Sequence, residues 1–164
     1  MHRSSKNRGE RIMTQEDKQL LLIDLCARLP YGVQCSCTWS HEVPNGTTGC
    51  VQELSTFLID EIEIMDNPEY DCQICDVKPY LRPMSSMTEE EKEYIKNRWC
   101  YNDWDIDGPS SLWREKIDVE DADGIIDYFN EHHLDHRGLI EKGLALEAPE
   151  GIYKNDYLWN LKEE

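Results

Sequence analysis

The chain begins with a helical pattern of apolar positions. Apolar residues recur every three or four positions from Leu21 to Leu29, which places them along one stripe of a helix. Thr14 stands where an N-cap is expected, and Pro30 stands where the helix should stop. The pattern therefore predicts a helix over residues 15–29.

The pattern then changes to strict alternation, which is typical of a half-buried strand. In VQCSCTWS, residues 33–40, the apolar face consists of Val33, Cys35, Cys37 and Trp39. Pro-Asn-Gly at 44–46 indicates a turn, and weaker alternation predicts strands over 47–54 and 57–65. A fourth strand is predicted over 70–77, with Tyr70, Cys72 and Ile74 on one face. Short successive strands joined by turns favour an α+β fold. We expect a short antiparallel β-meander or a small barrel packed against the N-terminal helix, followed by a helical C-terminal half.

Residues 78–91, KPYLRPMSSMTEEE, predict a joint between the last strand and a helix. Pro79 and Pro83 lack backbone N–H groups, so we expect sheet pairing to end near them. Thr88 and Glu91 have the spacing of a capping box, in which each side chain bonds the other residue's backbone amide. Because each of these features has a structural use, the segment is interpreted as a joint and not as the floor of an active site.

The rest of the chain is organised around an acidic loop over residues 99–123. A helix should follow from about Gly124, capped by Asp121 or Asp123. At the other end, residues 1–12 are basic and have no apolar periodicity, which predicts a disordered extension before a natural start at Met13. We expect a single domain over 13–164, with the first helix and the strands in 13–77 and the helical part in 78–164.

The charge balance indicates the kind of partner. The chain has 34 acidic and 17 basic residues, a formal net charge of −17, and a pI near 4.6. An acidic surface repels nucleic-acid phosphates and anionic lipid but attracts basic proteins. No apolar run approaches the ~20 residues that span a bilayer, and no secretion-signal pattern is present. These properties predict a cytoplasmic protein that binds neither nucleic acid nor membrane directly.

Seven cysteines are an odd number, and without a secretion signal they are expected to be reduced. Two pairs, Cys35 with Cys37 and Cys72 with Cys75, have spacings that resemble the half-sites of a four-thiolate zinc site. Both pairs fall in predicted strands, where Cys72 and Cys75 would point to opposite faces. Core thiols are therefore the favoured interpretation, with zinc as the alternative and no cofactor expected.

Two further segments resemble metal sites. Asp103, Asp105 and Asp107 followed by Gly108 match the start of a calcium loop, but the residue at the twelfth position is Arg114. His132 and His136 are four residues apart, so on a helix they would share one face as a metal pair does. A metal-binding module, or a metal-dependent enzyme, is thus the alternative function.

Three passages resemble a known family: LCARLPYGV (25–33), VKPYLRPMSSMTEEE (77–91) and HHLDHRGLIEKGLALEAPEGIY (132–153). They are similar to a family of small uncharacterised proteins encoded by gut bacteria and their phages or other mobile elements. The resemblance implies shared descent and a mobile-element context, and it implies no activity. The chain departs from the family's pattern at His136, where an aromatic Tyr is expected, and in the acidic loop.

The leading functional prediction is a small acidic interaction protein without catalytic activity. The sequence contains no phosphate-binding glycine loop, nucleophile elbow or H-E-x-x-H helix. Large aromatic residues among carboxylates combine interface anchors with steering charges. The predicted partner surface is formed by Trp99, Tyr101, Asp103, Trp104, Asp105, Asp107 and Trp113. In a sharper version the protein mimics nucleic acid and blocks a basic, nucleic-acid-binding partner in the bacterial host.

Overall fold

The computed structural model describes residues 13–40, 47–65, 69, 74–99 and 119–153. The predicted turn at 44–46, most of the acidic loop and residues 1–12 lie outside these ranges. The helices are α1 (Gln15–Arg28), α2 (Thr56–Ile64), α3 (Glu89–Trp99) and α5 (Val119–Glu131). The strands are β1 (Gln34–Ser40), β2 (Thr47–Glu53), β3 (Ile74–Leu81) and β4 (Leu146–Glu147). The α+β class and the first helix are confirmed, and none of the described helices is long and apolar enough to cross a membrane.

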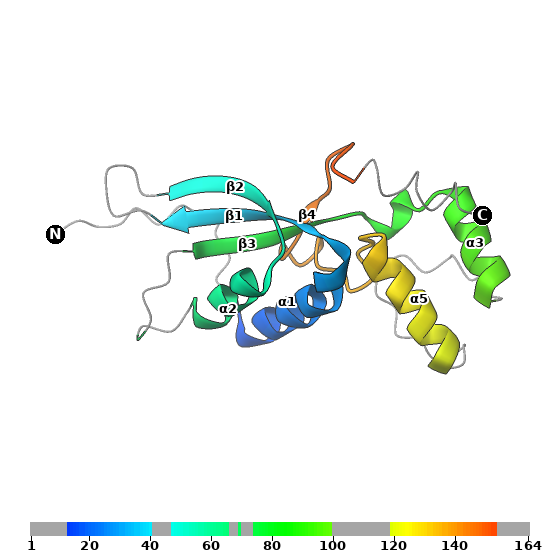
Figure 1. Cartoon of the computed structure of the whole chain (residues 1–164), viewed down its shortest axis with the longest axis horizontal. Coiled ribbons are helices and arrows are strands. Elements are labelled where there is room, and N and C mark those ends of the chain that lie inside the picture. The colour runs from blue at the N-terminus through cyan, green and yellow to red at the C-terminus, as the bar shows by residue number, and fades with distance from the viewer. Residues whose placement is uncertain (1–12, 41–46, 66–68, 70–73, 100–118, 154–164) are drawn as a thin grey trace.

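The sheet is open and mixed, so the meander and barrel forms of the prediction are wrong. Its strand order is β2-β1-β3-β4, with β1 antiparallel to both β2 and β3, and with β3 parallel to β4. A meander would place β3 beside β2, but α2 intervenes in the chain and returns it to the other side of β1. Helices α1 and α2 lie against one face of the sheet (Figure 1).

The predicted strand over 57–65 is instead helix α2. Its buried residues Leu58, Ile59 and Ile62 follow helical spacing, and Ser55 caps the helix by accepting from the Leu58 amide. The alternation of Ile62 and Ile64 with glutamates resembled a strand because short apolar runs fit both periods. Tertiary burial against α1 and β3 decides between them.

Strand β3 ends later than predicted, at Leu81, and it includes Pro79. Pro79 is the register partner of Cys35. On the other side of β1, the Leu54 amide of the chain after β2 donates to the Val33 carbonyl. Because hydrogen-bonded and non-hydrogen-bonded pairs alternate in an antiparallel ladder, the odd-numbered residues of β1 bond β2. The backbone groups of the even-numbered residues therefore point toward β3. Pro79 therefore stands where β1 offers no acceptor, and its missing N–H costs no bond to that strand.

The predicted joint after β3 is confirmed. The Thr88 amide donates to Glu91 Oε2 at 2.8 Å, and the Glu91 amide donates to Thr88 Oγ1 at 3.2 Å. Arg82 also holds the Glu91 carboxylate with both terminal nitrogens, at 2.8 and 2.9 Å. Burial raises the pKa of Glu91, but Arg82 and the Thr88 amide outweigh burial and lower it overall. The entry to α3 is thus fixed by charge as well as by capping.

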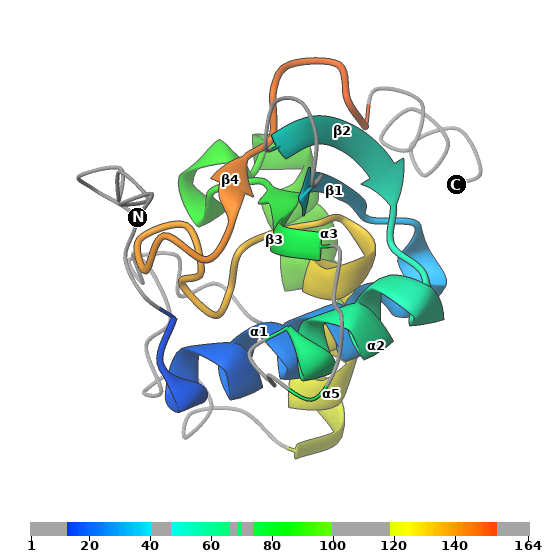
Figure 2. The same ribbon diagram turned by 90° about the vertical axis from the view of Figure 1, so that its left-hand side faces the viewer.

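Two apolar cores lie at opposite ends of the molecule. The first is enclosed by α1, α2 and the inner face of the sheet, and it includes Leu21, Cys35, Leu58 and Val77. The chain after α5 returns toward the sheet (Figures 1 and 2). Its residues Leu139, Leu144 and Tyr153 belong to this first core. The second core lies between α3 and α5 and contains Met87, Ile95, Ile125, Tyr128, Phe129 and Leu134.

Helix α5 begins at Val119, five residues before the predicted start at Gly124. Asp121 and Asp123 are consequently inside the helix and do not act as its caps. The error arose because Gly124 was taken as a boundary, although it occupies a helix interior position. The reason for a glycine there is the contact with Trp99 described below.

Candidate functional site

Of the predicted partner surface, only Trp99 lies within the described residues. Tyr101, Asp103, Trp104, Asp105, Asp107 and Trp113 lie outside them, so their role stays a prediction. Trp99 is partly buried at the end of α3 and packs on the second core. Its ring meets Tyr94 and Tyr128 edge to face, with centroid distances of 6.0 and 6.2 Å. This tryptophan therefore helps to join α3 to α5.

Trp99 also explains the glycine inside α5. A Cβ added to Gly124 would lie 2.6 Å from Trp99 Nε1 and 2.9 Å from Trp99 Cε2. Real Cβ atoms essentially never come this close to another heavy atom, so any side chain at this position must displace the indole. The glycine lets the edge of the ring approach the helix backbone.

The candidate zinc ligands that the structure describes, Cys35, Cys37 and Cys75, do not form a metal site. Cys35 and Cys37 are buried in the first core, and burial raises the pKa of Cys35 to about 12 and that of Cys37 to about 11. Cys75 is exposed, and its thiol donates to the Thr38 carbonyl at 3.3 Å. Cys72 lies outside the described residues. Within the described part of the chain, no three His, Cys, Asp or Glu side chains are placed to hold a metal ion.

The histidine pair does not share a helix face, which corrects that prediction. Helix α5 ends before His136 in a Schellman motif: the His133 amide donates to Asn130, and the Leu134 amide donates to Phe129. His133 adopts the left-handed conformation at φ 59° and stacks on Tyr153, with ring centroids 3.8 Å apart. His132 stacks on Tyr128 instead, with centroids 4.0 Å apart, and both His132 and His136 are buried.

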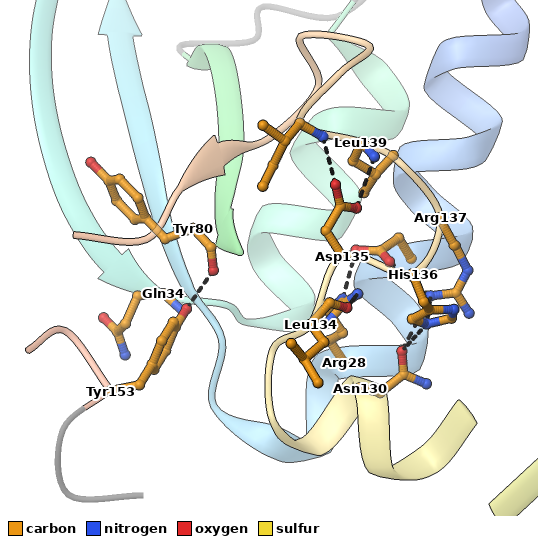
Figure 3. A network of polar contacts seen from close by, with 12 residues as sticks. Arg28, Gln34, Tyr80, Asn130, Leu134, Asp135, His136, Arg137, Leu139 and Tyr153 are labelled. Atoms are coloured by element: carbon orange, nitrogen blue, oxygen red, sulfur yellow. Dashed lines mark hydrogen bonds and ion pairs between the residues drawn. The ribbon is translucent and has the colours of Figure 1, made fainter. Parts of the chain in front are cut away.

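A buried polar network fixes the end of α5 against α1 (Figure 3). Arg28 donates to Asp24 at 2.8 Å and to the Leu134 carbonyl at 2.7 Å. Arg137 donates to the other Asp24 oxygen at 2.7 Å, and also to Asn130 on α5 at 3.2 Å. Asp24 and Arg28 are both fully buried. Because Asp24 is the carboxylate that serves both guanidinium groups, its removal would leave the fully buried Arg28 without a counter-charge.

The turn after α5 is also held by polar contacts. Asp135 accepts from the amides of Leu139 and Ile140 at 2.8 and 3.0 Å, so it caps this turn. Tyr153 donates to the Tyr80 carbonyl and accepts from the Gln34 amide, both at 2.8 Å (Figure 3). These contacts account structurally for the whole His-rich segment. They leave α5 as a rigidly anchored helix.

The outer face of α5 is the candidate interaction surface. Among the residues of this helix whose burial is described, the exposed ones are Asp123, Asp127 and Glu131. They are spaced four apart, so they lie along one side of the helix at intervals of about 6 Å. We call these three residues the acidic stripe.

The stripe runs against the local preferences of a helix. Like charges four residues apart destabilise a helix, and Glu131 stands at the end where the helix dipole disfavours a carboxylate. Helices α1 and α3 both have acidic residues in the first turn and basic residues in the last. Helix α5 has no basic residue in its last turn. The charges of the stripe thus have no evident role in stabilising α5.

The negative charges of the stripe also act on Tyr31, which lies shortly before β1. The pKa of Tyr31 is raised, first by burial and then by the negative charges of Asp127 and Glu131. A partly exposed phenol that two carboxylates act on offers a flat contact surface inside a region of negative potential. The candidate surface therefore includes Tyr31 as well as the stripe.

Sequence reasoning overlooked this surface although its signal was present. Asp123, Asp127 and Glu131 have plain i, i+4, i+8 spacing, but the helix was predicted to begin at Gly124 and Asp123 was assigned to a cap. The electrostatic effect of Asp127 and Glu131 on Tyr31 joins residues nearly 100 positions apart, and no local pattern encodes it. Comparison with known proteins adds no assignment: no family model, no curated protein and no solved structure matches this chain.

Proposed function

We propose that this chain is a small acidic interaction protein without catalytic activity, which binds a basic protein through α5. The observation that supports the proposal most directly is the acidic stripe of Asp123, Asp127 and Glu131 on a helix that is firmly anchored at its end. Sequences that break a local rule without structural compensation tend to do so at functional sites. Here the broken rule is the charge pattern of α5.

The stripe fits a partner with a basic surface. Exposed carboxylates at regular spacing attract Lys and Arg side chains and accelerate encounter, whereas they repel nucleic acid and anionic lipid. The net charge of −17 reinforces both effects. A protein face that normally binds phosphates has the chemistry that such a stripe would match, because it already presents cations for regularly spaced anions. The proposed role is therefore inhibition of a nucleic-acid-binding protein by occupation of its basic face.

The sequence resemblance adds a setting to this proposal. Similarity to small proteins of gut bacteria and mobile elements supports an origin in a phage or mobile element and action in the cytoplasm of the bacterial host. The aromatic residues Trp104 and Trp113, with Asp103, Asp105 and Asp107, supply the proposed anchors adjacent to α5 in the chain.

The proposal is tested by competition. The immobilised protein is exposed to host lysate, bound proteins are identified, and the purified partner is then titrated with fluorescent duplex DNA in the presence and absence of this chain. We expect the partner to be basic and the chain to displace the DNA. A variant with Asp123→Asn, Asp127→Asn and Glu131→Gln should lose at least tenfold in displacement.

A matched control separates the stripe from the net charge. The variant Glu53→Gln, Asp60→Asn, Glu63→Gln also removes three exposed negative charges, but from β2 and α2. It should therefore displace DNA nearly as well as the unmodified chain. Equal loss in both variants would show that only net charge matters. Undiminished displacement by the α5 variant would refute the stripe as the binding surface.

A further inference from the structure

Two cysteines face each other across the first strand pair. Cys37 on β1 and Cys50 on β2 are direct register partners in an antiparallel ladder. Such partners point to the same face of the sheet, and because the odd residues of β1 bond β2, this is a hydrogen-bonded pair with Cα atoms about 5.5 Å apart. Disulfides form between residues whose Cα atoms are about 4.4–6.8 Å apart. The backbone therefore already holds this pair at bonding distance.

The side chains are arranged accordingly. The Trp39 indole donates to Cys50 Sγ at 3.1 Å, and the Gln52 amide donates to Cys37 Sγ at 3.6 Å. Burial raises the pKa of the Cys37 thiol to about 11, and its neighbour Cys50 adds to that rise. The two sulfurs thus lie on the same face, between the side chains of Trp39 and Gln52.

The two thiols differ in accessibility, although they share one face of the sheet. Cys37 is buried, because it lies in the part of the face that α1 and α2 cover, whereas Cys50 on the outermost strand is exposed. An external oxidant can reach Cys50 directly. Cys37 is protected from it and can react only with its neighbour.

The other described cysteines do not form such a pair. Cys35 is two residues from Cys37 along the same strand, about 6.8 Å away at the outer limit for a disulfide, and its partner across β2 is Gln52. The Cys75 thiol bonds the Thr38 carbonyl, and Cys26 is exposed on α1. Geometry therefore selects one pair.

We propose that Cys37 and Cys50 form a reversible disulfide in exchange with an external low-molecular-weight disulfide such as oxidised glutathione. In the first step the Cys50 thiolate attacks one sulfur of the oxidant, forms a mixed disulfide and releases one glutathione thiolate. In the second step Cys37 loses its proton to solvent and attacks Cys50 Sγ, which releases the second glutathione. The protein dithiol is oxidised by two electrons, and one glutathione disulfide is reduced to two thiols.

The bond would close a loop of 14 residues, 37–50, and tie the outermost strand β2 to the central strand β1. It would also convert Cys50 Sγ, which accepts from the Trp39 indole, from a thiol to a disulfide sulfur, and the Trp39 ring stacks on Phe57 at 6.4 Å. Oxidation should therefore change the emission of Trp39 as well as the stability of this edge. The site is independent of the acidic stripe on α5.

The test is equilibration of the full chain in glutathione buffers of graded redox poise, followed by acid quenching, alkylation and digestion with a Glu-specific protease. Cleavage after Glu42 and Glu53 leaves Cys50 as the single cysteine of peptide 43–53. We expect this peptide to be linked to the peptide containing Cys37 under oxidising conditions, and to be released by dithiothreitol. The link should be lost in Cys50→Ser and kept in Cys35→Ser.

A spectroscopic readout distinguishes this bond from general thiol oxidation. The fluorescence change on oxidation should follow the same redox midpoint as the linked peptide, and it should be absent from Trp39→Phe, which retains the link. The proposal is overturned if Cys50 carries only glutathione at the most oxidising poise while Cys37 remains open to alkylation after denaturation. Linkage of Cys50 to a cysteine other than Cys37 would overturn it equally.

Discussion

Substitution of Gly124 by Ala should destabilise this protein, although the same change stabilises most helix interiors. Replacing Gly by Ala in a helix normally gains about 1 kcal/mol. Here the new methyl group would lie 2.6 Å from Trp99 Nε1, so the indole must move. Movement weakens the two edge contacts of Trp99 with Tyr94 and Tyr128, each worth about 0.5–1.5 kcal/mol. Loss of both, minus the gain in propensity, leaves a net destabilisation of about 0–2 kcal/mol.

A double-mutant cycle separates the effect of the Trp99 clash on the free energy of unfolding from the gain in helix propensity. Urea unfolding is measured for the unmodified chain, Gly124→Ala, Trp99→Ala and the double variant. In the Trp99→Ala background the clash is gone, so Gly124→Ala should stabilise by about 1 kcal/mol. The two backgrounds should differ by about 1–3 kcal/mol, the value of the lost ring contacts. Equal stabilisation by Gly124→Ala in both backgrounds would refute the packing of Trp99 on α5.

Three further predictions concern stability. Thr88→Ala should cost about 1 kcal/mol, the usual value of an N-cap hydroxyl, with an unchanged urea m-value. Arg82→Met should cost about 1.5–3 kcal/mol because it leaves the partly buried Glu91 carboxylate without its cation, whereas Lys92→Met, at an exposed pair, should change little. Burial lowers the pKa of His133 to about 3, so the unfolded chain binds its proton first and stability should fall by ~2 kcal/mol between about pH 7 and pH 5. The fall should be smaller in His133→Asn, which tolerates the same backbone conformation; an equal fall in both proteins would contradict the assignment to His133.

The local signals in the sequence were sufficient for several elements. Thr14 does cap α1, with the Asp17 amide donating to its hydroxyl at 3.1 Å, and the Thr88–Glu91 box does begin α3. The alternation in 33–40 correctly predicted β1 and its buried face. Each of these depends on neighbours within a few residues, so the pattern alone specifies the outcome.

The errors arose where distant contacts decide. Residues 57–65 fit both periods, and packing on α1 selects the helix. Pro79 is tolerated in β3 because the opposite residue of β1, Cys35, directs its backbone hydrogen bonds to β2. The pairing of β1 with β2 is a long-range contact, and no local sequence pattern indicates it. The end of α5 depends on His133 in a left-handed conformation, which its stacking on Tyr153 twenty residues later supports.

The same reasoning applies to the candidate site. Charge composition correctly indicated an acidic chain, but the arrangement of the carboxylates followed from the true start of α5 at Val119. Once the helix is extended, Asp123 joins Asp127 and Glu131 on one side. The placement of Tyr31 beside them depends on the network of Asp24, Arg28 and Arg137, which packs α1 against the end of α5.

The central claim, that α5 is the surface for a basic partner, is tested most directly by a residue-resolved NMR titration. A short Arg- and Lys-rich peptide is added to the isotopically labelled chain at near-physiological salt. We predict that chemical-shift changes concentrate at Asp123, Asp127, Glu131 and Tyr31, and that the changes disappear in the stripe variant Asp123→Asn, Asp127→Asn, Glu131→Gln. Changes that are spread evenly over the exposed acidic residues of α2, α3 and α5 would contradict the claim, as would changes centred on Asp60 and Glu63 of α2.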